Sequence, residues 1–286
     1  MAGTRLFVDP NSEAMNAYRG LYASNPARAA LVAEIAFEPQ GVWLLDDGAT
    51  VVASAVAQAR AVGQIPLLVA YNMNNVGPDG YAMWIEGVAT EIGSATVYIV
   101  LEPDALPTRG SAIAPVLAAA VTTLKANPNA AVLIDAGHSA WLSPGQAVSL
   151  LRDAGIAKAD GFSLNVSNFR AMDELTAYGD GIAAELQKFY VIDTSRNGDG
   201  PYGTDWCNPP GRALGLRPAI DPDRAHHPWL NAYLWVKRPG ESDGDAGNCY
   251  GGPAAGVWWE DYAVALVTNA GGATLAAGTL PAPLVG

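Results

Sequence analysis

The 286-residue sequence has little positive charge and no long apolar run. Its 16 lysines and arginines are outnumbered by 28 aspartates and glutamates, so the net charge is −12. This charge argues against binding to nucleic acid or to an anionic membrane surface, but it does not affect a neutral ligand such as a glycan. No apolar stretch is long enough to cross a membrane. We therefore expect neither nucleic acid nor a membrane as a partner, and we expect a monomer.

Histidine and cysteine are also scarce, with three and two residues. No histidines or cysteines stand at the spacing of metal ligands, and His226-His227 lies in a charged, proline-rich loop that we interpret as solvated. No glycine-rich phosphate loop follows the first predicted strand, which argues against a nucleotide-binding open sheet. We expect no metal and no cofactor.

Cys207 and Cys249 lie in segments rich in glycine, proline and asparagine, on either side of the last predicted strand. They could be two free thiols of a cytosolic enzyme, but a buried structural thiol more often lies inside a strand or helix. We favour a disulfide that pins two loops, and hence an oxidising compartment. The sequence starts without an apolar leader, so we expect a secreted protein whose signal peptide is absent from this sequence.

Seven short apolar runs are each followed by a polar or ionisable residue. The most informative is Val97–Leu101, because it ends directly in Glu102-Pro103-Asp104. An unbroken apolar run is typical of a strand buried on both faces, and Pro103 ends its ladder. A single acid after a single strand would more often belong to an ordinary turn, but the repetition of this pattern after several strands favours a functional site. The other predicted strands are 41–45, 66–70, 131–134, 162–164, 189–192 and 232–236.

Helical patterns separate most of these strands, and we expect helices over 51–62, 83–92, 113–124, 144–151 and 182–186. Alternating strands and helices predict right-handed βαβ units and a parallel sheet. Units of roughly thirty residues favour a (β/α) barrel over an open sheet. We therefore expect one catalytic barrel domain over residues 1–270, with its chemistry at the carboxyl ends of the strands. The Gly/Ala/Pro-rich segment 271–286 is interpreted as a tail.

The eight tryptophans differ in their predicted surroundings. Trp43 and Trp235 lie within strands, where they could belong to the core, and Trp84 is most simply a packing residue on a helix. Trp141 and Trp206 instead stand at a strand end and in a loop. Indole rings beside carboxylates and amides suit sugars, because the C–H faces of a pyranose stack on them. This pattern indicates a carbohydrate ligand.

The same strand ends resemble those of the glycoside hydrolase family 6 cellulases. The resemblance covers about residues 7 to 269, and the segments that carry it are 98–107, 135–141, 165–169, 192–198, 206–209 and 235–244. It implies a distorted, seven-stranded parallel (β/α) barrel that hydrolyses β-1,4-glucan with inversion. Inversion requires a protonated acid and a base-activated water on opposite faces of the sugar, with the two carboxyls roughly 6.5–9.5 Å apart.

The resemblance also implies roles for individual residues. Asp104 is the general acid, and Asp243 is the candidate base, acting directly or through a relay of waters. Tyr71 crowds the reactive sugar and helps to distort it. Asp135 and Arg196 support the site. The residues implied to line the sugar subsites are Trp43, His138, Trp141, Asn165, Trp206, Lys237 and Glu241.

The segment after Tyr71 departs from the family pattern. Members usually read Tyr-Asn-x-Pro-x-Arg-Asp-Cys-Gly and continue into a mobile Ser/Gly-rich loop, whereas here a helix is predicted almost at once. The missing aspartate normally helps to keep the catalytic acid protonated by like-charge proximity. Asp79 is the residue that could replace it. The loop after Asp104 also lacks its cysteine and looks shortened.

Two functions therefore stay open. Short loops leave a cleft open to attack within a chain, which favours an endo-β-1,4-glucanase. The alternative is a non-catalytic or strongly impaired glucan-binding relative, because the Arg-Asp-Cys loop after Tyr71 is missing.

Overall fold

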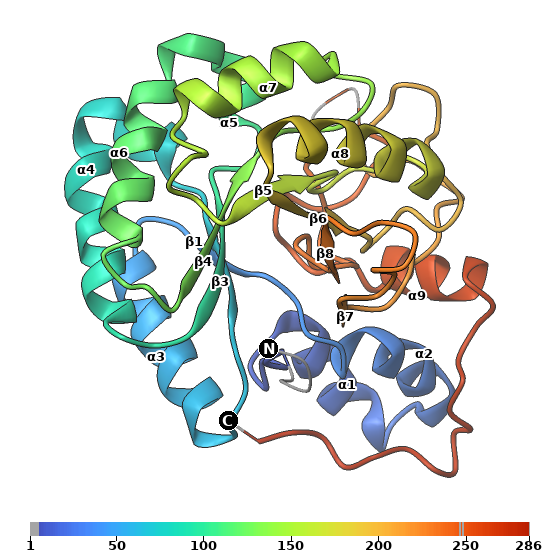
Figure 1. The fold of residues 1–286 in the computed structure, drawn as a ribbon. Helices are drawn as coiled ribbons and strands as arrows, with labels where there is room; N and C mark the ends of the chain where they lie inside the picture. The colour runs from blue at the N-terminus through green and yellow to red at the C-terminus, as the bar shows by residue number, and fades with distance from the viewer. Residues whose placement is uncertain (1–5, 246, 248, 286) are drawn as a thin grey trace.

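A computed structural model describes residues 6–245, 247 and 249–285. Seven parallel strands lie side by side in the order β1-β2-β3-β4-β5-β6-β8, and they curl into a distorted barrel (Figure 1). The short strand β7 (Ala219–Ile220) pairs antiparallel with β8 at the edge. The seven predicted strands are confirmed, while β7 was missed because two residues carry no periodic pattern. The parallel strands are β1 (Val42–Leu44), β2 (Leu67–Ala70), β3 (Val97–Leu101), β4 (Ala130–Asp135), β5 (Gly161–Leu164), β6 (Phe189–Asp193) and β8 (Leu230–Leu234).

Successive side chains on the strands point to opposite faces, as the two-residue period of a strand requires. In β2, Leu67 and Val69 belong to the core inside the barrel, whereas Leu68 and Ala70 belong to the core beneath the helices. Both faces of the sheet are therefore buried, which explains the unbroken apolar runs in the sequence.

The two ends of the curled sheet meet at Gly41. Its amide donates a hydrogen bond of 2.9 Å to the carbonyl oxygen of Trp235, just after β8. A Cβ atom at Gly41 would lie 2.3 Å from the carbonyl oxygen of Val236. Only glycine permits this approach of the first and last parallel strands, which positions Trp43 and Val236 next to each other.

The helices between successive parallel strands cover the outside of the barrel in chain order (Figure 1). The helix predicted over 144–151 begins where the sequence predicts, because the Ser143 hydroxyl accepts a bond from the Gln146 amide and Pro144 occupies the first helical position. The helices predicted over 51–62, 83–92 and 182–186 start three to ten residues earlier than expected, whereas the one predicted over 113–124 starts one residue later and ends as predicted. The five longest of these helices are α3 (Gly48–Ala61), α4 (Met73–Ile92), α6 (Ala114–Leu124), α7 (Pro144–Asp153) and α8 (Met172–Leu186).

The segment between β2 and α4 consists only of Tyr71 and Asn72. The first turn of α4 is separated from the rest by a kink, where Gly77 has φ of +67° and Pro78 follows. The helix expected soon after Tyr71 is thus present, and it starts ten residues earlier than the predicted first residue, Met83. A loop of two residues is too short to fold over the barrel mouth.

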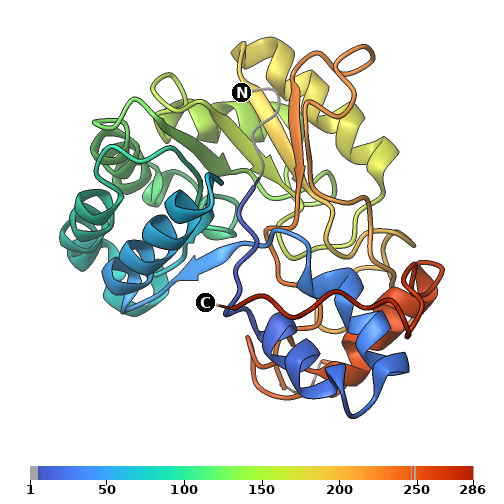
Figure 2. The ribbon, with the colours of Figure 1, turned by 90° about the horizontal axis from the view of Figure 1, so that it is seen from below.

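Three further helices form a separate layer that was not predicted, namely α1 (Glu13–Tyr22), α2 (Pro26–Ala36) and α9 (Glu260–Asn269). They share one core with Trp235 and lie together in Figure 2. The C-terminal segment runs along this layer, where the Tyr18 hydroxyl donates to the carbonyl oxygen of Pro281 (2.7 Å). No helix in the described part of the chain has the length and apolar character needed to span a bilayer.

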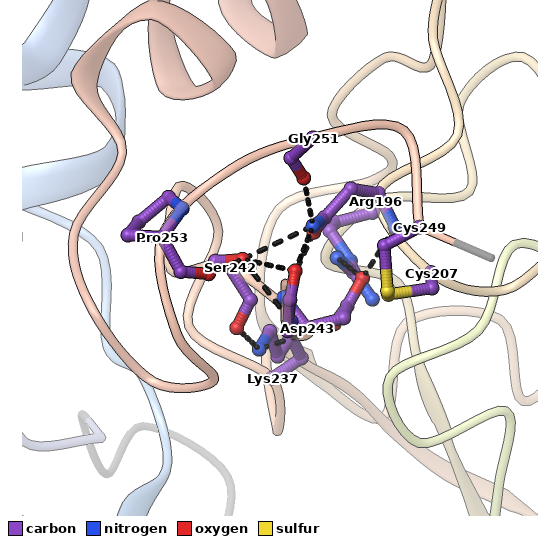
Figure 3. Close-up of a disulfide and its surroundings, with 10 residues drawn as sticks. Arg196, Cys207, Lys237, Ser242, Asp243, Cys249, Gly251 and Pro253 are labelled. Carbon is purple, nitrogen blue, oxygen red and sulfur yellow. Dashed lines mark hydrogen bonds and ion pairs between the residues drawn. A yellow bond between two sulfur atoms is a disulfide. The ribbon is translucent and has the colours of Figure 1, made fainter. Parts of the chain in front are cut away.

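The predicted disulfide between Cys207 and Cys249 is present (Figure 3). The two Cα atoms are 4.8 Å apart, and 42 positions separate the residues in sequence. The bond joins the long loop between β6 and β7 to the loop after β8. Asn208 reinforces the junction, because its side-chain amide donates to the carbonyl oxygens of Gly244 and Gly251 (2.9 Å each).

We expect the double substitution Cys207→Ser/Cys249→Ser to lower the free energy of unfolding by about 4 kcal/mol, because it removes a cross-link that closes a loop of this length. Urea denaturation at equilibrium measures the difference. With a strong reductant present, wild type and variant should unfold at the same urea concentration. An unchanged unfolding free energy without reductant would contradict the expectation.

Candidate active site

A cavity of about 720 Å³ opens at the carboxyl ends of the strands, where the barrel was expected to keep its chemistry. Its volume lies in the range of small-molecule sites, about 300–1,000 Å³. The structure brings nine of the predicted site residues into its lining. They are Trp43, Tyr71, Asp104, His138, Trp141, Trp206, Lys237, Glu241 and Asp243.

Asp104 enters the cavity from a strained turn. Glu102 and Asp104, on either side of Pro103, have φ values of +48° and +69°, which few residues other than glycine adopt. The buried carboxylate of Asp135 holds the turn by accepting a bond of 2.9 Å from the Asp104 amide. Strain that is maintained by buried partners is typical of functional sites, so this turn marks Asp104.

The environment of Asp104 favours its protonated form. Burial, and then the nearby charge of Asp243, raise its pKa to about 6. Burial and the proximity of Asp104 similarly raise the pKa of Asp135 to about 7. A carboxyl group that stays neutral in mildly acidic solution can donate a proton, which is the requirement for a general acid.

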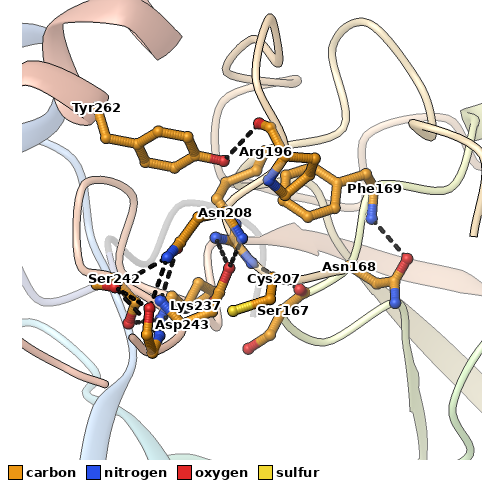
Figure 4. A network of polar contacts seen from close by, with 12 residues as sticks. Ser167, Asn168, Phe169, Arg196, Cys207, Asn208, Lys237, Ser242, Asp243 and Tyr262 are labelled. Carbon is orange, nitrogen blue, oxygen red and sulfur yellow. Dashed lines mark hydrogen bonds and ion pairs between the residues drawn. The ribbon is translucent and has the colours of Figure 1, made fainter. Parts of the chain in front are cut away.

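Asp243 has the opposite environment. One carboxylate oxygen lies 2.7 Å from Nη1 of Arg196 and accepts the Asn208 amide at 3.0 Å, and the other lies 3.2 Å from Nζ of Lys237 (Figure 4). Burial alone would raise the pKa of Asp243, but Arg196 and Lys237 outweigh it and hold the pKa below its usual range. Asp243 is therefore an ionised carboxylate.

Arg196 is itself fixed from several sides. It is fully buried, donates from Nη2 to the carbonyl oxygen of Ser167 (2.6 Å) and lies 4.4 Å from the centroid of the Phe169 ring. Figure 4 shows this guanidinium between Phe169 and Asp243. It lies beneath the cavity rather than in its lining, which agrees with the supporting role expected from the sequence.

His138 is neutral and has a defined tautomer. Burial, and then the charge of Arg170, lower its pKa to about 4. Its Nδ1 accepts a bond from the Ala140 amide (3.3 Å), so the proton resides on Nε2. The ring lies 5.4 Å from that of Trp141, which places a hydrogen-bond donor beside an indole.

Trp43 and Tyr71 pack edge to face at the ends of β1 and β2, with ring centroids 5.1 Å apart. The indole of Trp43 donates to the carbonyl oxygen of Val236 (2.9 Å), which fixes its orientation. Burial, and then the charge of Asp104, raise the pKa of Tyr71, so its phenol is neutral. The pair forms an oriented aromatic wall next to Asp104.

Two of the predicted site residues do not line the cavity. Asn165 is fully buried, and its side chain donates to the carbonyl oxygen of Asp193 (2.8 Å) and accepts from the Arg170 amide (3.0 Å). It shapes the loop after β5 instead of facing a ligand. Asp79 is exposed on α4, directly after the kink at Gly77 and Pro78.

Buried acids at other strand ends hold the loops of the site. Glu102 accepts bonds from the amides of Asn72 (2.9 Å) and Met73, and Asp193 accepts from the amides of Ser167 and Lys237. The position of an acid after an apolar run indicates a structural or functional role. It does not show whether the side chain holds a loop in place or binds a ligand. Lining residues that the sequence did not single out include Thr108, Ser167, Asn168, Arg170, Asp205 and Arg238.

Comparisons with known proteins agree with this architecture. The family model described as "Glycosyl hydrolases family 6" matches residues 1–270. The chain is 39% identical to Endoglucanase A of Cellulomonas fimi over 92% of its own length, and 38% identical to Endoglucanase 1 of Streptomyces sp. strain KSM-9 over 82%. It spans 61% and 74% of the length of those two relatives.

A solved structure of the endoglucanase Cel6 from Mycobacterium tuberculosis, in complex with methyl-cellobiosyl-4-deoxy-4-thio-β-D-cellobioside, is 40% identical. The two structures superpose with a TM-score of 0.86 over 94% of this chain and 98% of that one. The distorted barrel and these matches define a glycoside hydrolase. More specifically, the chain belongs to glycosyl hydrolase family 6.

We expect Asp79→Ala to leave the pKa of Asp104 unchanged, because burial and Asp243 account for its elevation. Carbon-13 NMR of protein with labelled aspartate carboxyls follows the titration, and Asp104→Asn identifies the signal that belongs to Asp104. Asp243→Asn is the matched comparison and should lower this pKa, since it removes a like charge. A lower pKa in the Asp79 variant would contradict the expectation.

Proposed function

We propose that the protein hydrolyses internal β-1,4-glucosidic bonds of cellulose or soluble β-glucan with inversion of the anomeric configuration. One observation carries this proposal. Asp104 and Asp243 line the same cavity in opposite electrostatic environments: the pKa of Asp104 is raised to about 6, so it keeps its proton in mildly acidic solution, whereas the pKa of Asp243 is lowered. An inverting glycosidase needs this combination of a proton donor and an anion.

In the proposed reaction, Asp104 donates its proton to the glycosidic oxygen as the bond from C1 to that oxygen breaks. A water molecule attacks C1 from the opposite face, and its proton passes towards Asp243. The lowered pKa makes Asp243 a weak base, so it suits late proton transfer, directly or through water. Its negative charge also stabilises the oxocarbenium-like transition state.

The rest of the cavity lining supports a glucan as the ligand. Trp43, Trp141 and Trp206 offer indole surfaces for pyranose rings, while His138, Lys237 and Glu241 offer polar groups for hydroxyls. Tyr71 lies close enough to Asp104 for the charge of Asp104 to raise the pKa of its phenol, and in this position it would crowd the reactive sugar. The named relatives are endoglucanases, and the two-residue loop after β2 leaves that side of the cleft open.

The alternative function, a glucan-binding relative with lost or impaired catalysis, has less support. It rested on the missing Arg-Asp-Cys loop after Tyr71, whose aspartate is expected to keep the acid protonated. In this protein, burial and Asp243 raise the pKa of Asp104 without that residue.

We further propose that the protein is secreted and monomeric, and the disulfide supports an oxidising compartment.

We expect Asp104→Asn to lower turnover on cello-oligosaccharides by roughly 100-fold or more, because the amide cannot protonate a poor leaving group. Aryl cellobiosides with an activated leaving group need less protonation, so their turnover should fall much less. Steady-state rates on both substrates measure the difference. An equal loss on both would show that Asp104 is not the general acid.

A further inference from the structure

An exposed pair of tyrosines lies next to the cavity and takes no part in the proposed reaction. The exposed fractions of Tyr202 and Tyr250 are 42% and 45%. Their rings meet edge to face, with centroids 5.7 Å apart. Trp206, which lines the cavity, is 51% exposed. Scattered exposed aromatics are normal on a protein surface, but here three of them lie within one pair of loops that a disulfide links.

The backbone places Tyr202 at the rim of the cavity. Its neighbours Pro201 and Gly203 both belong to the lining. A tight turn then folds the chain back, so that the Asp205 amide donates to the carbonyl oxygen of Tyr202 (3.1 Å), and Gly203 supplies the positive φ of +58°. Tyr202 is thereby held beside Asp205, the cavity residue that directly precedes Trp206.

Tyr250 is attached to the same place by two links. Its hydroxyl donates to Oδ2 of Asp205. The preceding residue, Cys249, is bonded to Cys207, which directly follows Trp206. The disulfide and the hydrogen bond therefore hold Tyr250 against the loop that carries Tyr202 and Trp206.

Arg212 also contacts Tyr202. Its guanidinium lies 5.5 Å from the centroid of the Tyr202 ring, and Nη1 donates to the carbonyl oxygen of Gly200 (2.8 Å). The tyrosine pair is thus fixed before any ligand arrives. Contact with a fixed ring costs a ligand little conformational entropy, so such a ring is an efficient binding surface.

We propose that Tyr202 and Tyr250 form an additional sugar subsite, which extends the binding cleft beyond the cavity at its Trp206 end. The inference rests on the proposed function, and the ligand is a further glucosyl unit of a β-1,4-glucan chain. Bonds inside a polymer can be cut only if the chain runs out of the cavity on both sides. A tyrosine ring offers an apolar face for the C–H groups of the sugar, and Asp205 offers a carboxylate for its hydroxyls.

The dependence of binding affinity on the length of the oligosaccharide tests the proposed subsite. Isothermal titration calorimetry in the Asp104→Asn background compares the affinities for cellotetraose and cellohexaose without hydrolysis. Tyr202→Ala and Tyr250→Ala should each weaken cellohexaose binding by about 5-fold, the value of one aromatic contact of about 1 kcal/mol. Cellotetraose is the shorter ligand and does not need the additional subsite, so its binding should not change. Tyr250→Phe keeps the ring and should retain most of the cellohexaose affinity.

Phe189→Ala is the matched control, because Phe189 is 40% exposed at the start of β6, at the end of the barrel away from the cavity. It should change neither affinity. Unaltered cellohexaose binding in both tyrosine variants would contradict the proposed subsite. An equal loss of affinity for the two oligosaccharides would also contradict it, because it would show that the tyrosines only shape the Trp206 loop. Failure of the proposed function is recognised separately, by a wild-type protein that hydrolyses neither oligosaccharide.

Discussion

Two aspartates in one buried cavity repel each other when both are ionised, and the arrangement of the site depends on how this repulsion is resolved. Arg196 and Lys237 stabilise the charge on Asp243, whereas burial and the charge of Asp243 raise the pKa of Asp104. The proton therefore stays on Asp104. Because like charges interact strongly in a desolvated site, the anion on one side helps to keep the acid on the other side neutral.

This arrangement explains how the chain can lack the Arg-Asp-Cys loop of its family. The loop aspartate is one means of keeping the acid protonated, but burial and Asp243 achieve the same result here. The connection after β2 is reduced to Tyr71 and Asn72, and the buried carboxylate of Glu102 accepts the Asn72 amide to fix it. A connection of two residues is too short to cover the cleft at this position.

Much of the barrel could be predicted from the sequence, because strands buried on both faces produce apolar runs that polar residues end. The helical layer of α1, α2 and α9 could not, since its core includes Trp235, which the sequence places in a strand although β8 ends at Leu234. The disulfide was predictable from the loop-rich surroundings of Cys207 and Cys249. The sequence did not reveal the tyrosine pair, because Tyr202 and Tyr250 are brought together by a turn and by that disulfide.

The orientation of strand-end residues was the least predictable feature of the site. Asp104, Asp193 and Asn165 all lie near strand ends, yet only Asp104 lines the cavity. Asn165 has a φ of +67° and turns its side chain towards the carbonyl oxygen of Asp193, so it builds the loop instead. A local sequence pattern gives the position of a residue along the barrel, while backbone hydrogen bonds decide the direction of its side chain.

In the proposed mechanism, the proton donor Asp104 and the anion Asp243 act from opposite faces of the sugar. The most direct test is proton NMR of the first sugar released from a β-1,4-glucan, recorded before mutarotation equilibrates the anomers. Inversion predicts that the α-anomer appears first and that the β-anomer grows in later. Initial release of the β-anomer would mean retention, and would contradict the roles given to Asp104 and Asp243.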